Sequence, residues 1–175
     1  MMSGSGSIAF ISLGSNIGDK YRYCREGIAA LEADVQTVVT SRSPFYRTEP
    51  VDYRDQDWFV NAVVRIETRR DPLALLALLN AIEARAGRKR GGVRFGPRTL
   101  DMDIIFYGGR IMTDPALTLP HPRMHKRRFV LQPLCDIDPT IVHPVFHKTV
   151  QYLLDHLDDE GQEIHPYNEQ GAPSF

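Results

Sequence analysis

The sequence predicts an α+β protein with a ferredoxin-like βαββαβ core, an antiparallel sheet with helices packed on it, plus a C-terminal extension. Three observations support this prediction. Strand and helix patterns follow one another in the order strand, helix, strand, strand, helix, strand. The second and third strands are adjacent in the sequence, as in a split βαβ arrangement. The chain has 175 residues, enough for one domain with a full hydrophobic core.

The first strand and helix are expected between residues 8 and 33. Residues 8–13 form a short apolar run with glycines on both sides, which favours a buried strand. A turn is expected at residues 14–19, and Asp19 is suited to cap a helix. The helix itself is indicated by apolar residues at helical spacing, namely Tyr21, Cys24, Ile28 and Leu31.

The middle of the core is predicted to hold two strands and a second helix. Residues 35–45 and residues 58–68 show the alternation and the β-branched content of strands. Residues 46–56 contain a proline and several charged side chains, so a long loop is expected there. An Asp-Pro pair at residues 71–72 favours a helix start, and Gly87 is a suitable stop.

The last core strand is predicted at residues 101–107, and it carries two carboxylates. Side chains alternate along a strand, which places Asp101, Asp103, Ile105 and Tyr107 on one face and Met102, Ile104 and Phe106 on the other. The two carboxylates then point the same way, roughly 7 Å apart. Mg²⁺ prefers one or two carboxylates and completes its shell with water and phosphate oxygens. The alternative is a polar strand end with two solvated acids.

Shorter elements are expected outside the core. They are a hairpin within 108–119, a helix at 128–135 and a terminal helix at 150–157. We expect a single domain over residues 8–160, a disordered lead at 1–7 and a polar tail at 161–175.

The composition is that of a soluble protein and narrows its partners. The net charge of −1 shows no global bias toward nucleic acid or membrane surfaces. Two cysteines form no disulfide framework and no zinc spacing, and no apolar run is long enough to span a bilayer. The first residues lack the pattern of a signal peptide. We therefore expect a cytoplasmic protein, with a monomer favoured.

Two clusters of basic residues predict a focused anion site. Residues 85–98 and 121–128 are rich in lysine and arginine and contain no acid. Arg88 lies in a glycine-rich stretch, which suggests a mobile loop that closes on a triphosphate. Arg98 adjoins the aspartates and suits bidentate phosphate binding. Solvated cations at a helix end are the alternative, which fits Arg85 better than Arg98.

A few other polar residues are candidates for a site. Asn61 stands mid-strand, where an amide can read the edge of a heterocycle or be satisfied by the backbone. His121 lies between two prolines in a basic loop, and it either donates to phosphate or is an ordinary surface histidine. Glu83 opposes the dipole at a helix end, which mildly disfavours a structural role. Gly14 follows the first predicted strand, but the residues after it do not form a P-loop motif. It either allows a tight turn or lines a substrate site.

The stretch 94–103, Arg-Phe-Gly-Pro-Arg-Thr-Leu-Asp-Met-Asp, closely resembles the signature of the 6-hydroxymethyl-7,8-dihydropterin pyrophosphokinase family of folate biosynthesis. Shorter stretches agree with that family in order and spacing, at residues 12–16, 45–50, 59–62 and 119–122. The resemblance covers roughly residues 8–139. It implies the ferredoxin-like fold and the transfer of pyrophosphate from ATP to the pterin hydroxymethyl group, leaving AMP.

The resemblance also implies a role for individual residues. Two Mg²⁺ ions would be held by Asp101 and Asp103. ATP would be bound by Glu83, Arg88, Arg98, His121 and Arg127, with Arg88 on the moving loop. The pterin edge would be read by Gly14, Thr48 and Asn61, and its ring would lie between Phe59 and Phe129. Phe59 departs from the tyrosine more common in the family, and stacking should survive this change.

Two other classes of function compete with this one. A ferredoxin-like sheet with aspartates and basic loops also describes polymerase palms and RNA-binding sheets, although the chain lacks their aromatic run. The second alternative is a regulatory module that binds a small molecule and catalyses no reaction. AMP formation only in the presence of the pterin would exclude a pure binder, and salt-sensitive binding to an oligonucleotide would favour the nucleic-acid hypothesis.

Overall fold

The computed structural model describes residues 5–51, 53–87, 98–158 and 162–168. The elements occur in the order β1 (Ser7–Ser15), α1 (Lys20–Ala33), β2 (Thr37–Arg42), β3 (Phe45–Thr48), β4 (Phe59–Thr68), α2 (Pro72–Arg85), β5 (Asp101–Tyr107), β6 (Met112–Thr113), β7 (Thr118–Leu119), η1 (Met124–Lys126), α3 (Arg128–Ile137), α4 (Val150–Asp155) and β8 (Ile164–Tyr167).

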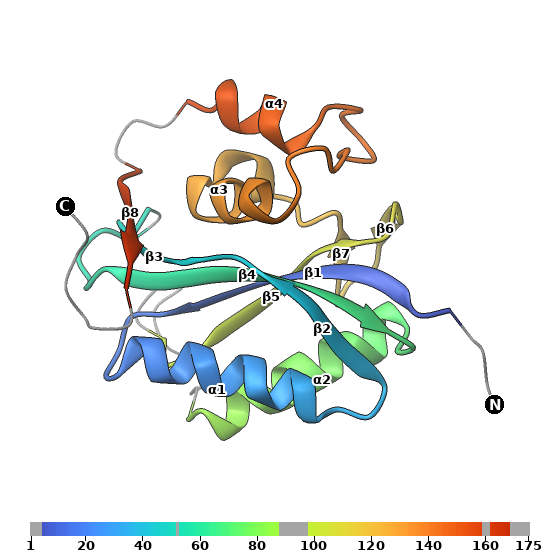
Figure 1. Cartoon of the computed structure of the whole chain (residues 1–175), viewed down its shortest axis with the longest axis horizontal. Helices are drawn as coiled ribbons and strands as arrows, with labels where there is room; N and C mark the ends of the chain where they lie inside the picture. The colour runs from blue at the N-terminus through green and yellow to red at the C-terminus, as the bar shows by residue number, and fades with distance from the viewer. Residues whose placement is uncertain (1–4, 52, 88–97, 159–161, 169–175) are drawn as a thin grey trace.

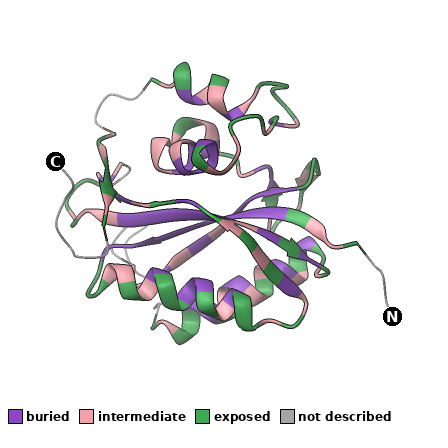
Figure 2. Ribbon diagram, in the orientation of Figure 1, coloured by how far each residue is buried: buried purple, intermediate pink, exposed green. Residues whose placement is uncertain are grey.

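The main sheet is antiparallel and has the strand order β5-β1-β4-β3-β8, with β2 also paired to β4. Helices α1 and α2 cover one face, and α3 and α4 lie over the other (Figure 1). The central strands are largely buried between these layers (Figure 2). The predicted α+β class and ferredoxin-like core are confirmed. A ferredoxin-like core by itself predicts helices on one face of the sheet only. In this protein the second face is also partly covered, by α3 and α4.

Both core helices begin where their capping residues predict. The carboxylate of Asp19 accepts a hydrogen bond from Arg22 N at 3.1 Å, and that of Asp71 accepts one from Ala74 N at 2.8 Å. These bonds satisfy donors that a helix start leaves without a partner. Gly87 follows α2 with a φ of +82°, a left-handed conformation that glycine adopts without strain.

The strand predicted at residues 35–45 corresponds to β2 and to the first residue of β3. The rest of β3 occupies the start of the loop predicted at residues 46–56. β2 pairs with the second half of β4, and β3 pairs with its first residues. Between them Ser43 bonds Val63 twice, donating from its N to Val63 O and accepting at Oγ from Val63 N, each at 2.9 Å. Pro44 cannot donate to a ladder, so the strand is interrupted there.

The expected alternation along β5 is wrong beyond Ile105. The register against β1 shifts between Phe10 and Ile11, which is the mark of a β-bulge. Ile105 and Phe106 both pack in the cluster beneath α3, whereas Tyr107 belongs to the core under α1 and α2. Only the first part of the strand therefore keeps the predicted faces, and this part holds Asp101 and Asp103.

An ion pair fixes the corner between α1 and β2 and should make stability depend on pH. Asp34 accepts hydrogen bonds from Arg70 at 2.8 and 2.9 Å and from Thr37 Oγ1 at 2.7 Å. The Arg70 guanidinium, more than any other group, lowers the pKa of Asp34 from 3.8 to about 2. Because the folded pKa is depressed, the stabilisation of roughly 2 kcal/mol is complete above about pH 4 and is lost as the pH falls toward 2.

The variant Asp34→Asn should therefore unfold at lower urea concentration than the wild type at pH 6. The difference in unfolding free energy should shrink as the pH is lowered to 3 and below. Asp114→Asn, on an exposed turn, is the matched control and should change little. An Asp34→Asn deficit that stays constant between pH 6 and pH 3 would contradict the assignment.

Candidate active site

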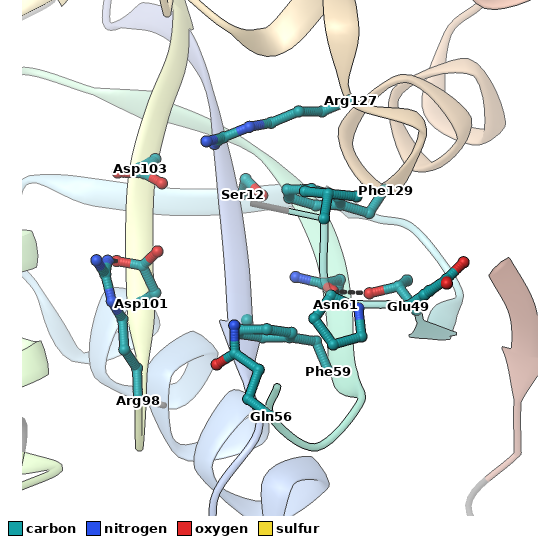
Figure 3. Close-up of a pocket in the computed structure, with 14 residues that line it drawn as sticks. Ser12, Glu49, Gln56, Phe59, Asn61, Arg98, Asp101, Asp103, Arg127 and Phe129 are labelled. Carbon is teal, nitrogen blue, oxygen red and sulfur yellow. Dashed lines mark hydrogen bonds and ion pairs between the residues drawn. The ribbon is translucent and has the colours of Figure 1, made fainter. Parts of the chain in front are cut away.

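A pocket that is open to solvent lies on the face of the sheet opposite α1 and α2. It is built by the ends of β1, β3, β4 and β5 and by the start of α3 (Figure 3). Its lining residues are Ser12, Gly14, Thr48, Glu49, Pro50, Val51, Gln56, Phe59, Asn61, Arg98, Asp101, Asp103, Arg127 and Phe129.

Strand register places key positions of the pocket in one row. Gly14 of β1 pairs with Asp101 of β5 on one side and with Asn61 of β4 on the other. A carboxylate and an amide thus flank a position without a side chain. A Cβ on Gly14 would lie 2.4 Å from Asn61 Nδ2, too close for any real contact. Glycine is required here for space rather than for a turn.

The two aspartates form the acidic wall of the pocket (Figure 3). Burial and then the nearby charge of Asp101 raise the pKa of Asp103 from 3.8 to about 7. The charge of Glu83 acts in the same direction, and Arg127 and Arg98 oppose it. Arg98 Nη1 lies 3.0 Å from Asp101 Oδ1. Two carboxylates that disfavour each other's ionisation in a partly buried wall favour an added cation.

The donor set fits magnesium rather than a metal held by protein ligands alone. Within residues 5–168, leaving out the undescribed positions, no group of three or more His, Cys, Asp and Glu side chains could hold a metal ion. Two carboxylates with open space beside them match the partial ligand set that Mg²⁺ takes when substrate phosphates complete its shell.

Arg98 is held in place through its backbone by Asn16. Asn16 N donates to Arg98 O at 3.1 Å, and Arg98 N donates to Asn16 Oδ1 at 2.8 Å. The Asn16 amide also donates to Gln56 Oε1 at 2.8 Å and to Asp57 O at 3.2 Å. A buried side chain thus connects the arginine, the end of β1 and the loop before β4.

An amide at the base of an aromatic slot forms the other half of the pocket. The rings of Phe59 and Phe129 lie on opposite sides of the slot, and Asn61 lies between them (Figure 3). Thr48 Oγ1 donates to Asn61 Oδ1, and Asn61 Nδ2 donates to Leu13 O at 3.3 Å. These bonds fix the amide orientation and leave it one donor and one acceptor site for a ligand. A flat heterocycle with polar edges suits this slot.

Arg127 extends from the start of α3 toward Asp103 (Figure 3). Its guanidinium carbon lies 5.4 Å from the centre of the Phe129 ring, so it borders both halves of the pocket. Nearby, burial and the charge of Arg127 lower the pKa of His121 to about 4, so the imidazole is neutral at pH 7. Its Nδ1 accepts from Arg123 N at 3.1 Å, which leaves the proton on Nε2.

The pocket gathers most of the residues that the sequence singled out. Nine of the predicted residues line it, namely Gly14, Thr48, Phe59, Asn61, Arg98, Asp101, Asp103, Arg127 and Phe129. Glu83 is buried on the other side of β5, where it accepts from Met102 N at 2.9 Å. His121 is not among the lining residues, although the charges of Arg127 and Asp101 act on its pKa. Arg88 and the predicted loop around it lie outside the described residues.

Sequence reasoning missed several lining residues. Ser12, Glu49, Pro50, Val51 and Gln56 were not among the predicted site residues. Ser12 carried a usable signal, because it lies two positions before Gly14 in an otherwise apolar strand. The others belong to a segment that was predicted to be a loop and whose first residues form β3.

No helix in the described part of the chain is long and apolar enough to cross a membrane.

The chain is similar to a known enzyme family over most of its length. A family model for 7,8-dihydro-6-hydroxymethylpterin-pyrophosphokinase matches residues 10–139. The 2-amino-4-hydroxy-6-hydroxymethyldihydropteridine pyrophosphokinase of Bacillus subtilis is 46% identical over 131 residues, which cover 75% of this chain and 78% of that protein. The protein of the same name from Methylorubrum extorquens is 43% identical over 155 residues, covering 89% and 96%.

Longer proteins contain a similar region. The folic acid synthesis protein fol1 of Schizosaccharomyces pombe is 39% identical over 90% of this chain, which spans only 21% of that protein. A solved HPPK-DHPS structure from Plasmodium falciparum aligns with a TM-score of 0.71 over 99% of this chain and 49% of its own. At 16% identity this last likeness concerns the fold.

Proposed function

Because this chain belongs to the 7,8-dihydro-6-hydroxymethylpterin-pyrophosphokinase family, we propose that it transfers pyrophosphate from ATP to 6-hydroxymethyl-7,8-dihydropterin, giving AMP and the pterin diphosphate. One observation carries the proposal. The pairing of β1 with β5 and with β4 places an acidic wall next to a slot formed by an amide and two aromatic rings, and arginines lie at the border of the two. The pocket thus offers one half to a triphosphate and the other to a flat heterocycle.

The slot would bind the pterin. Phe59 and Phe129 would stack on its two faces, which excludes water from the ring. Asn61 would use its remaining donor and acceptor on the polar edge of the heterocycle. Thr48 would hold the Asn61 amide in the orientation that this recognition needs. The hydroxymethyl group would then point toward the aspartates.

The basic residues would bind ATP. Arg98 and Arg127 border the acidic wall, and their guanidinium groups suit bidentate contacts with phosphate oxygens. The neutral His121 would donate its Nε2 proton to the same phosphates. Arg88 would contribute as the resemblance implies, and Glu83 would act on the ATP side through its charge near Asp103.

Asp101 and Asp103 would hold two Mg²⁺ ions together with the phosphates. The bound ions would supply positive charge against the negative charge that develops on the attacking and leaving oxygens. The substrate hydroxyl would attack the β-phosphorus in line. The residues of the pocket would contribute mainly by orientation and charge, because phosphoryl transfer needs little covalent help from a protein.

A coupled assay tests the proposed reaction. The protein should form AMP from ATP and Mg²⁺ only when 6-hydroxymethyl-7,8-dihydropterin is present, and AMP and pterin diphosphate should appear in equal amounts. Release of ADP in place of AMP, or AMP formation without the pterin, would contradict the proposal. Binding of both ligands without any product would indicate a binding module.

A further inference from the structure

The C-terminal segment 162–167, here called the clasp, contacts both sides of the pocket. It contains β8 and the preceding Gln162 and Glu163. The clasp lies beyond residues 10–139, the part of the chain that the family model matches. In Figure 1, β8 lies at the edge of the sheet beside β3.

On one side the clasp holds β3 and the residue that follows it. β8 pairs antiparallel with β3, and Thr48 is opposite Ile164. The pairing continues one residue further, since Glu49 N donates to Glu163 O at 2.9 Å and Glu163 N donates to Glu49 Oε2 at 3.0 Å. Thr48 orients the Asn61 amide and Glu49 lines the pocket. The strand that carries them would otherwise be a sheet edge, with backbone groups open to solvent.

On the other side Gln162 holds the start of α3. Its Oε1 accepts from Arg128 N at 2.9 Å, and its Nε2 donates to Lys126 O at 3.1 Å. The two bonds span Arg127 and immediately precede Phe129. The residue at the helix start is an arginine, whose side chain only donates and cannot accept from a helix N–H. A glutamine from a distant part of the sequence therefore satisfies one of the backbone donors at the start of the helix.

A third contact joins the clasp to the residue before Phe59. The ring of His165 stacks on Trp58, with 6.0 Å between centroids and 16° between planes. The guanidinium carbon of Arg47, a residue of β3, lies 4.2 Å from the centre of the Trp58 ring. The clasp thus touches the neighbours of both aromatic rings and of Thr48.

We propose that the clasp sets the width of the slot by joining β3 to the start of α3, and that Gln162 is a positioning residue for the bound pterin. This inference rests on the proposed function. Gln162 touches neither substrate. Its side chain acts on one side through Arg127 and Phe129, and the backbone of the clasp acts on the other side through β3. The hydrogen bonds and strand pairs of the clasp described above involve β3, Glu49 and the start of α3, which border the aromatic half of the pocket.

The test uses the full chain with Gln162→Met, which keeps the length of the side chain and removes both hydrogen bonds. Gln162→Glu keeps the acceptor for Arg128 N and loses the donor to Lys126 O. Gln151→Met is the matched control, because the Gln151 side chain donates to its helix neighbour Asp155 on α4 and does not line the pocket. The readouts are KM for the pterin, KM for ATP, kcat and Tm.

We expect KM for the pterin to rise roughly tenfold in Gln162→Met, which corresponds to about 1.4 kcal/mol. KM for ATP should rise less, because Gln162 holds the backbone on both sides of Arg127 whereas Arg98 is held by Asn16. Gln162→Glu should lie between the wild type and Gln162→Met, and Gln151→Met should match the wild type. A purely structural role would lower Tm or kcat without separating the two KM values. Equal changes in both KM values, or none, would overturn the proposal.

Amide hydrogen exchange keeps this test independent of the reaction. In Gln162→Met, exchange should become faster both in residues 45–49 and in residues 127–129, and should stay unchanged in β1. Unchanged exchange in residues 45–49 or in residues 127–129 would overturn the proposed role of the clasp, even if the wild type forms AMP. If the wild type forms no AMP while exchange responds as expected, the proposed reaction fails and the clasp stands.

Discussion

The variant Asp103→Asn is expected to lose AMP formation almost completely, by at least about 10³-fold, because a neutral amide binds a magnesium ion much more weakly than a carboxylate and does not balance its charge. Asp101→Asn should show a loss of the same order. The coupled assay at saturating ATP, pterin and Mg²⁺ measures both. Unchanged turnover in either variant would refute the assignment of the two aspartates as metal ligands.

The stability of these variants separates loss of metal binding from loss of folding. Asp101 and Asp103 repel each other in the folded protein, and this repulsion is part of what raises the pKa of Asp103. Removing the Asp103 charge should leave Tm unchanged or raise it when it is measured without divalent cations. Asp101→Asn also loses the ion pair with Arg98, so Asp103→Asn is the variant that decides this point. Asp114→Asn, on the exposed turn of the hairpin, serves as a control with wild-type activity. A variant that is both inactive and less stable would point to misfolding.

The second large effect is expected from Gly14→Ala. The added Cβ would lie 2.4 Å from Asn61 Nδ2 and 3.6 Å from Phe59 Cδ1, so the Asn61 amide must move. Moving it breaks its bonds to Thr48 and Leu13 and misplaces the groups that would read the pterin. We expect KM for the pterin to rise by roughly tenfold to a hundredfold, the range for one or two lost polar contacts.

A double-mutant cycle shows whether Gly14 acts through Asn61. Asn61→Ala alone should weaken pterin binding by a similar factor. Adding Gly14→Ala to it should cost much less than Gly14→Ala costs in the wild type, because the clashing group is gone. Gly109→Ala is the control, since a Cβ there would meet no described atom within 4 Å. Fully additive losses would refute the steric explanation.

Long elements with clear periodicity could be predicted from the sequence. The helices at 20–33 and 72–85 start at the predicted caps, and the buried strands fall where apolar runs predicted them. The acid pair at Asp101 and Asp103 was identified by its conflict with an otherwise apolar strand. The positive charge beside this acid pair could be anticipated, because basic residues lie close to Asp101 and Asp103 in the sequence.

The errors have a common physical cause. β3 and β8 have four residues each and lie near the edge of the sheet, where pairing with a neighbour decides the structure more than local propensity does. The bulge at Ile105 depends on the packing of β5 against β1 and leaves no local pattern. Likewise, Glu49 and Gln56 line the pocket only because distant segments bring them there. The pterin itself came from the resemblance, since an asparagine and two phenylalanines do not specify a heterocycle.

The row formed by Asp101, Gly14 and Asn61 ties the appearance of activity to folding. Its three members come from strands far apart in the chain, so loops must close before any two of them meet. No short fragment of the chain can therefore hold a partial site, and such non-local pairing makes folding slow compared with helical proteins. During refolding, activity should return together with β-sheet formation and later than the helices. Core substitutions that slow this step should reduce the fraction of active molecules and leave the KM values of those molecules unchanged.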